Sequence, residues 1–176
     1  VEVKALHLRL YFSESSSILP VSELAGDYAV MTHTDAGTPN LNPSELLILA
    51  TQNNTTVEIR PSKPTVSGRP GGIPFTIILQ RGQQFQLQSS FDLSGTRIRS
   101  IDASKRIAVF SGARQANVLC GADDHVYEQA VPFSRNGTMY HVVPMLGHAY
   151  DLIKILANEN GTSVVINGNL LYNLSL

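Results

Sequence analysis

The sequence is poor in cysteine, tryptophan and charge. Its 176 residues include one cysteine, no tryptophan and 15% charged residues, where about a quarter is usual. A single cysteine excludes an internal disulfide framework and a metal site built from several thiolates. Thirteen Lys and Arg against fourteen Asp and Glu give a net charge of −1, so no basic field points to nucleic acid. No apolar run approaches the ~20 residues of a membrane span.

The polar surface is built from hydroxyls and amides. Ser, Thr and Asn number 39, while hydrophobic residues reach 43%, which is enough for a core. This balance is typical of an extracellular or glycosylated β-protein. No signal peptide is recognised, because Val1 opens directly into a strand pattern, so the chain reads as mature or excised.

Hydrophobic residues recur with a period of two, and no segment of ten residues carries a helical stripe. The longest alternating run is 1–12, with a phase slip at Lys4-Ala5 that predicts a β-bulge. Residues 13–17 are predicted to form a polar loop. Further strands are predicted at 28–31, 45–50, 55–60, 75–80, 84–88, 97–101, 106–110, 139–143, 152–156, 163–166 and 170–174.

An internal repeat organises these strands. Residues 44–59 and 151–166 agree at seven of sixteen positions, at a constant offset of 107 residues. Upstream, Pro20-Val21-Ser22 is echoed by Pro132-Phe133-Ser134. We therefore predict an all-β fold of two tandem, related β-sandwich-like units with a pseudo-two-fold repeat. The units are 1–97 and 98–176, the second being truncated at its C-terminal end.

The truncation predicts self-association. In the first unit, strand 75–80 returns through a turn into 84–88, whereas nothing matches this return after 170–174. An apolar strand with an unpaired edge is a template for another strand. We expect either closure within the chain, or a ring or filament by strand addition; the next segment of a longer chain is the alternative. The residues predicted to form the interface are Val1, Val3, Leu6, Leu8, Leu10, Leu170, Tyr172 and Leu174.

Five Asn-x-Ser/Thr sequons predict N-glycosylation. They lie at Asn53, Asn54, Asn136, Asn160 and Asn173. Asn53 and Asn54 are adjacent, so steric bulk allows only one glycan there. Asn53 and Asn160 occupy equivalent turns, where asparagine also serves the turn itself. Asn136 is therefore the clearest candidate.

Residues 120–128 hold a thiol and a polar cluster. Asp123 and Asp124 are weak candidates for a calcium site. Apart from this calcium, we expect no cofactor. The alternative is that these side chains order their own loop through hydrogen bonds. Cys120 has apolar neighbours and is predicted to be a free, buried thiol rather than an interchain disulfide.

Two sets of side chains were considered for catalysis. The histidines are His33, His141 and His148. The carboxylates are Glu23, Glu45, Glu58 and Asp151, of the kind that glycoside hydrolysis requires in pairs. The Gly-x-Ser-x-Gly and His-Glu-x-x-His motifs are absent from the sequence, so we expect no enzyme. A carbohydrate-active hydrolase or a lectin on a β-sandwich is the alternative.

Several phrases carry a family resemblance: LPVSELAGDY (19–28), residues 44–59, RIAVFSG (106–112), DHVYEQ (124–129) and ILANENGTSVVING (155–168). In this order and spacing they resemble the IgGFc-binding-protein N-terminal domain family. The resemblance implies a secreted or cell-surface, non-enzymatic adhesion or binding module of the matrix. Its partners would be proteins, either copies of itself or other matrix glycoproteins.

The chain departs from the family pattern at one place. The family has a cysteine before the Ala-x-Val phrase and another before Asp-His. Gln115 and Asp123 stand there instead, so the local disulfide that the resemblance implies cannot form.

Overall fold

The structure is a computed structural model that describes the whole chain except residues 10–11, 35–40, 118–122, 144–145, 148–150 and 175–176. The described residues form antiparallel strands and two short 3₁₀ turns, with no α-helix among them, so the predicted all-β class is confirmed. They fall into two compact units, Val1–Thr138 and Met139–Leu176.

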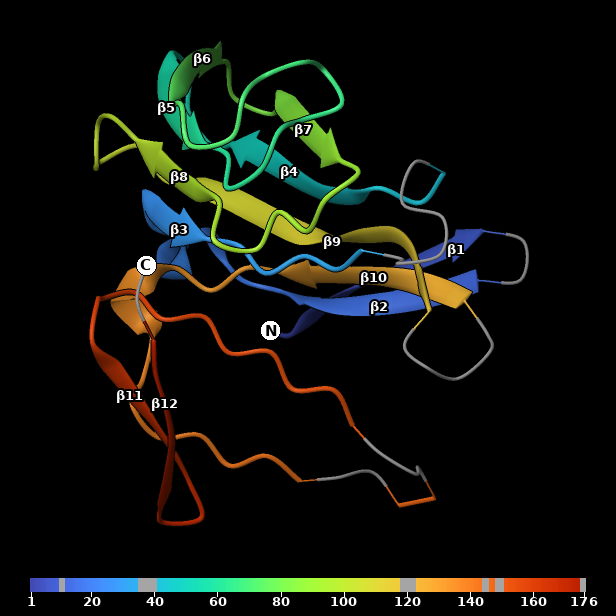
Figure 1. Ribbon diagram of the computed structural model, residues 1–176. Helices are drawn as coiled ribbons and strands as arrows, with labels where there is room; N and C mark the ends of the chain where they lie inside the picture. Colours follow the sequence, from blue (N-terminus) through green and yellow to red (C-terminus); the bar gives the residue numbers. More distant parts are fainter. Residues whose placement is uncertain (10–11, 35–40, 118–122, 144–145, 148–150, 175–176) are drawn as a thin grey trace. The chain divides into compact units, whose positions relative to one another are not determined.

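The first unit contains ten strands and both 3₁₀ turns (Figure 1). The strands are β1 (Val3–Arg9), β2 (Phe12–Ile18), β3 (Asp27–Ala29), β4 (Ser44–Ala50), β5 (Thr55–Arg60), β6 (Phe75–Leu79), β7 (Gln84–Ser89), β8 (Arg97–Ser100), β9 (Ile107–Asn117) and β10 (Asp123–Gln129). The 3₁₀ turns are η1 (Val21–Glu23) and η2 (Phe133–Arg135).

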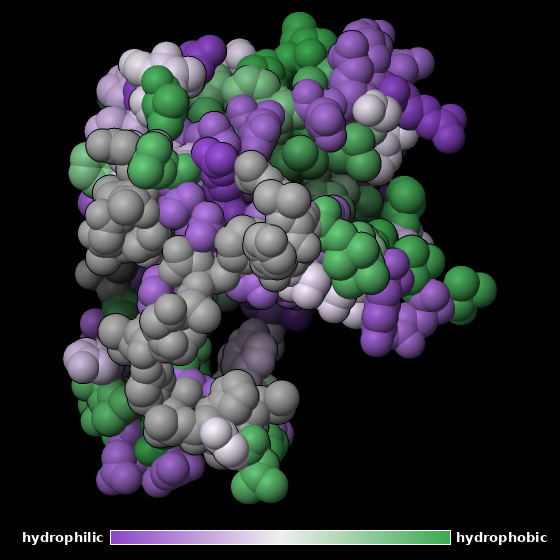
Figure 2. Space-filling view, turned by 90° about the vertical axis from the view of Figure 1, so that its right-hand side faces the viewer, coloured by the Kyte–Doolittle hydropathy of each residue, from purple (hydrophilic) through white to green (hydrophobic). Residues whose placement is uncertain are grey.

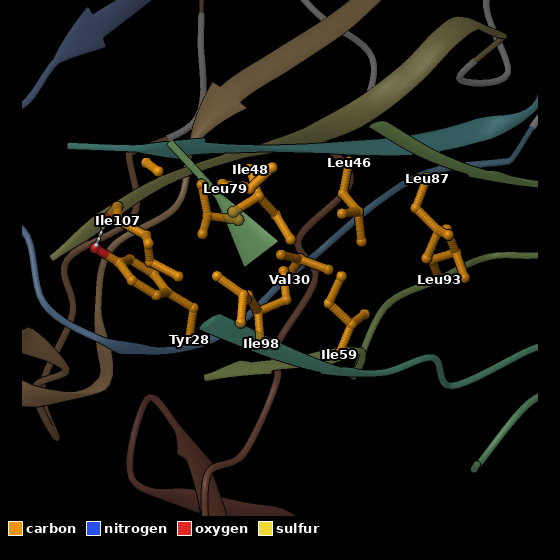
Figure 3. Close-up of a cluster of buried hydrophobic side chains, with 13 residues drawn as sticks. Tyr28, Val30, Leu46, Ile48, Ile59, Leu79, Leu87, Leu93, Ile98 and Ile107 are labelled. Atoms are coloured by element: carbon orange, nitrogen blue, oxygen red, sulfur yellow. Dashed lines mark hydrogen bonds between the residues drawn. The ribbon is translucent and has the colours of Figure 1, made fainter. Parts of the chain in front are cut away.

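Two four-stranded sheets form a sandwich in this unit. Their strand orders are β10-β9-β4-β7 and β3-β8-β5-β6. Every second residue of β4 and β5 is buried, as the alternation of a half-buried strand requires. These inward side chains meet those of the facing sheet in one core (Figure 3). The core residues are Tyr28, Val30, Leu46, Ile48, Ala50, Val57, Ile59, Leu79, Leu87, Leu93, Ile98, Ile107 and Val109.

A smaller apolar cluster covers the outer face of the β10-β9-β4-β7 sheet. Leu24, Ala108 and Phe110 are its buried members. Leu47 and Leu49, which point away from the main core, pack against them. The chain after β2 therefore shields one side of β4 and β9, and both faces of these strands lie against apolar side chains.

The β1–β2 hairpin corrects two predictions. Its ladder runs without a register shift from Val3 opposite Ile18 to Arg9 opposite Phe12, so the bulge predicted at Lys4-Ala5 is wrong. The serine-rich residues 13–17 belong to strand β2 and not to a loop. Backbone hydrogen bonds define a strand, so a segment with small hydroxyl side chains and no apolar pattern can form one when another strand pairs with it.

The second unit holds one hairpin, β11 (Thr162–Ile166) and β12 (Asn169–Leu174). Its ladder shifts register between Val164 and Val165. The strands predicted at 139–143 and 152–156 are absent from the described secondary structure. No ladder between described strands includes these two segments, and an apolar run becomes a strand only when another strand pairs with it.

The repeat units and the pseudo-two-fold remain predictions. Strand β9, which the predicted boundary at residue 97 assigns to the second unit, pairs with β4 from Ile107 to Ala113. Local similarity at the 107-residue offset is nevertheless present. The turn before β5 has Asn54 at φ 54°, and the turn before β11 has Gly161 at φ 73°.

Tyr28 ties the two sheets together. Its hydroxyl donates to the Ile107 carbonyl oxygen at 2.8 Å and accepts from the Ala25 N–H at 3.0 Å (Figure 3). The side chain is fully buried, and burial raises the pKa of Tyr28. One hydroxyl thus satisfies the carbonyl oxygen of the buried Ile107 and the N–H of the half-buried Ala25.

We predict that Tyr28→Phe lowers the free energy of unfolding by about 1–3 kcal/mol, because the buried Ile107 carbonyl and the half-buried Ala25 N–H lose their partner. Urea denaturation at pH 7 measures this, with the exposed Tyr172→Phe as the control. An unchanged denaturation midpoint in Tyr28→Phe would contradict the role assigned to the hydroxyl.

The raised pKa adds a pH dependence. In the unfolded chain Tyr28 ionises near pH 10, below the point at which it ionises when folded. The stabilisation by the neutral phenol is complete below about pH 10 and is lost as the pH rises further. This alkaline loss should be smaller in Tyr28→Phe than in the parent chain.

Candidate binding surface

The most exposed apolar strand of the first unit is β1. Leu6 and Leu8 are 65% and 73% exposed, and Val1 and Val3 are exposed as well. One edge of β1 pairs with β2, whereas no described strand pairs with the other edge. Figure 2 shows hydrophobic residues at the surface, interspersed with hydrophilic ones. Strand β1 therefore offers both apolar side chains and an open row of backbone groups.

Hydrogen bonds through Ser16 and Gln129 hold the hairpin on β10. The Ser16 hydroxyl accepts from the Gln129 N–H at 3.1 Å and donates to Glu128 at 3.1 Å. The side-chain oxygen of Gln129 accepts from the Leu19 N–H at 2.7 Å. Ser16 and Gln129 are both buried. These contacts fix β2, so that β1 lies on the far side of an anchored strand.

Tyr127 provides the aromatic part of the same contact. Its ring lies 4.2 Å from the His7 ring of β1 and stacks on Phe110 at 5.2 Å, measured between centroids. Desolvation, followed by the nearby Glu128 carboxylate, raises the pKa of Tyr127. The contact with His7 keeps β1 close to the sheet, and the contact with Phe110 joins β10 to β9.

The second unit also exposes apolar side chains. Leu170 and Tyr172 of β12 are exposed, and Leu174 is half-buried. Leu152, Ile153 and Ile155 in the segment without a ladder are more than half exposed. Leu10, the remaining residue predicted for the interface, lies outside the described residues.

All five sequon asparagines are exposed. The side-chain oxygens of Asn53, Asn54 and Asn173 accept hydrogen bonds from Arg81 N, Gln80 Nε2 and Ser163 Oγ. Asn160 sits in the turn before β11. Asn136 follows η2 and uses its backbone N–H to close that turn on Phe133, which leaves its side chain in the exposed loop.

The acidic cluster orders its own strand. The Asp124 carboxylate accepts from the His125 N–H at 2.8 Å, and His125 Nδ1 lies 2.6 Å from the Arg114 carbonyl oxygen. Among the described residues no three His, Cys, Asp or Glu side chains converge on a metal position. Cys120 and the side chain of Asp123 lie outside the described part, so the thiol and calcium predictions remain predictions.

The carboxylates considered for catalysis are separated and partnered. Glu23 forms an ion pair with Arg135, and Glu58 forms one with Arg99 at 3.2 Å. Glu45 accepts from Gln86 and Gln88 at 2.9 and 2.8 Å. Glu45 and Glu58 point outward from the two different sheets, which places the core between them. The structure does not bring these groups together as a glycosidase pair.

The remaining catalytic candidates belong to both units. His33 is half-buried in the first unit, while His141 and Asp151 are exposed in the second. His148 lies outside the described residues. In the described part of the chain, no helix has the length and hydrophobicity for a membrane crossing.

Comparison with known proteins places the chain in a family. The family model described as IgGFc binding protein matches residues 14–174. The chain belongs to this family. The human IgGFc-binding protein is 33% identical over 166 residues. That alignment covers 90% of this chain and 3% of the human protein. No solved structure matches the chain.

This family member closes the β9–β10 hairpin without the cysteine pair. The ladder sets Asp123 opposite Asn117 and Asp124 opposite Ala116, then shifts register and resumes with Val126 opposite Ala113. Gln115 lies at that shift. Backbone pairing thus holds the two strands where the family resemblance implies a disulfide.

Sequence reasoning missed the anchoring of the hairpin. Ser16 and Gln129 come from segments 113 residues apart, and neither residue type signals burial. The serine-rich composition of β2 pointed to a loop. The alternation over 1–12, by contrast, did predict a strand there.

We predict that Asn136 carries a glycan when the chain is produced in a eukaryotic secretory host. Asn136→Gln should lower the mass by one N-glycan, measured by intact-mass spectrometry. Thr138→Ser keeps the sequon and should keep the glycan, whereas Thr138→Ala should lose it. Equal masses for the parent chain and Asn136→Gln would contradict the assignment.

Proposed function

We propose that the chain is an extracellular, non-enzymatic binding module that acts through protein–protein contacts and associates with copies of itself. The observation that carries this proposal is the open, apolar edge of β1 on a hairpin anchored to β10. The family relationship and the exposed sequons support an extracellular setting. Adhesion within a glycoprotein matrix is the role that fits such a surface.

The described side chains favour contact over chemistry. The candidate carboxylates are engaged in ion pairs or amide hydrogen bonds, and Glu45 and Glu58 lie on opposite outer faces of the sandwich. A retaining or inverting glycosidase needs two carboxyl groups about 5–10 Å apart. Extended apolar strands, in contrast, bind other strands without any special side chain.

Strand addition supplies enough free energy for association. Each new backbone hydrogen bond contributes about 0.5–1.5 kcal/mol net. Each aliphatic side chain that becomes buried adds roughly 1.5–3 kcal/mol. Several of each offset an association cost of about 4–15 kcal/mol.

The name of the human relative supplies one defined ligand to test. That protein is described as binding the Fc part of immunoglobulin G, and we propose Fc as a protein ligand for this module too. The exposed β1 edge would present backbone groups and leucines to it. Binding of Fc to the immobilised chain, with the Fab part as the control, tests this.

We predict that the chain forms oligomers in solution and that Leu6→Lys with Leu8→Lys weakens them, because charges would be buried in the contact. Sedimentation velocity over a concentration series measures the mass relative to 19.1 kDa. Ile78→Lys, at an exposed position of β6, is the matched control and should leave the mass unchanged.

A monomer at every concentration would overturn the self-association. Oligomers that resist the leucine changes would show that another surface is used. Turnover of a glycan substrate by the intact chain would favour the hydrolase alternative.

A further inference from the structure

Strand β4 shows what the repeat segment does when it is paired. It lies between two strands and pairs with β7 from Ser44 to Leu49 and with β9 from Ser44 to Ala50. Its inward residues Leu46 and Ile48 are 1% and 0% exposed. Pairing with β7 and β9 places β4 in its sheet, and packing against the facing sheet then buries these side chains.

Residues 151–157 match β4 in sequence and lead into the same turn. After β4, the Thr55 hydroxyl donates to the Gln52 carbonyl oxygen at 2.8 Å. After 151–157, the Thr162 hydroxyl donates to the Glu159 carbonyl oxygen at 2.8 Å. Both acceptor and donor stand at the 107-residue offset. The turn that follows this segment therefore matches the turn between β4 and β5.

The surroundings of the two segments differ. Ile153 and Ile155, which align with Leu46 and Ile48, are 53% and 52% exposed. No ladder between described strands includes 151–157. The segment has the sequence of a central strand and the exposure of a strand that lacks its neighbours.

The hairpin that pairs with β4 also has a counterpart. Strands β9 and β10 are followed by η2, whose cap Pro132 has φ −67° and ψ 154°. Strands β1 and β2 are followed by η1, whose cap Pro20 has φ −65° and ψ 155°. The edge of β9 opposite β10 pairs with β4, whereas no described strand pairs with the equivalent edge of β1.

We infer that residues 151–157 of one copy pair, as an antiparallel strand, with the open edge of β1 of a second copy. This inference rests on the self-association proposed above and names its two surfaces. Each copy carries one donor edge, on β1, and one acceptor segment, residues 151–157. The contact is therefore head to tail and generates a ring or a filament.

The organisation of the chain indicates that the strand pairing with residues 151–157 comes from a second copy. The element order hairpin, proline-capped turn and β4-like segment occurs twice, and the first unit pairs such a hairpin with such a segment. A second copy supplies the same hairpin with its edge open. The β1 edge is apolar, with Leu6 and Leu8, and the acceptor segment presents Leu152, Ile153 and Ile155. Both surfaces are mainly apolar, although β1 also carries Lys4 and Arg9 and the segment carries Asp151 and Lys154.

The equivalence also gives a register. Ala5 pairs with Ser16 in the first hairpin. Aligning the bounds of β2 and β10 sets Ser16 on Tyr127, whose partner is Gly112. Gly112 pairs with Glu45, and Glu45 aligns with Leu152. Ala5 of one copy should therefore lie opposite Leu152 of the next.

Cysteine cross-linking tests this pairing between copies. One chain carries Ala5→Cys and a differently tagged chain carries Leu152→Cys, both with Cys120→Ser. A short bis-maleimide should join the two tagged chains in a mixture. Leu171→Cys, at an exposed position of β12, replaces Leu152→Cys in the control and should cross-link at least tenfold less.

Charge substitutions in the otherwise natural chain give a second measurement. Ile153→Lys with Ile155→Lys should weaken association by roughly 100-fold, as two buried aliphatic side chains would be lost. Leu170→Lys with Leu171→Lys should leave it within about threefold. Sedimentation equilibrium provides both constants, and circular dichroism confirms that the strands remain.

The outcomes separate this inference from the function on which it rests. A monomeric parent chain would overturn both. Oligomers lost on changing β12 but kept on changing 153 and 155 would overturn the inference and retain self-association. A chain that carries both cysteines and cross-links only within itself would show pairing in cis and would also overturn the inference.

Discussion

The backbone ladders on both edges of β4 are the interaction on which the rest of the first unit depends. Strand β4 joins β7 to the β9–β10 hairpin and so assembles one whole sheet of the sandwich. Its inward side chains fill the main core, and Leu47 and Leu49 on its other face meet the cluster around Phe110. Buried backbone donors and acceptors must be paired. Each strand of the sheet is therefore positioned by the strand with which it pairs.

The sequence predicted the strands that show clear alternation between clear turns. β4, β5, β6 and β7 follow one another with clear alternation and clear turns, and all of them form. The 152–156 segment has the same alternation and forms no strand within the described structure. Alternation reports that a segment can bury one face, but a ladder needs a second segment, which local sequence does not reveal.

The contacts that set the candidate surface were less visible in the sequence. Tyr28 reads as one tyrosine among six, although its hydroxyl satisfies groups on β9 and beside η1. Ser16 and Gln129 are ordinary polar residues whose burial follows from the packing of β2 on β10. Strand β1 itself could be predicted because Leu6 and Leu8 alternate with polar residues over a long run, but its pairing with β2 alone could not.

The anchoring of β2 on β10 uses hydroxyl, amide and backbone groups in its two hydrogen bonds through Gln129. Neither a serine hydroxyl nor a glutamine amide titrates in the physiological range, and their hydrogen bonds depend little on ion screening. These two hydrogen bonds should therefore depend little on acidity and salt content. The contact between β2 and β10 would keep both of them under conditions that weaken ion pairs.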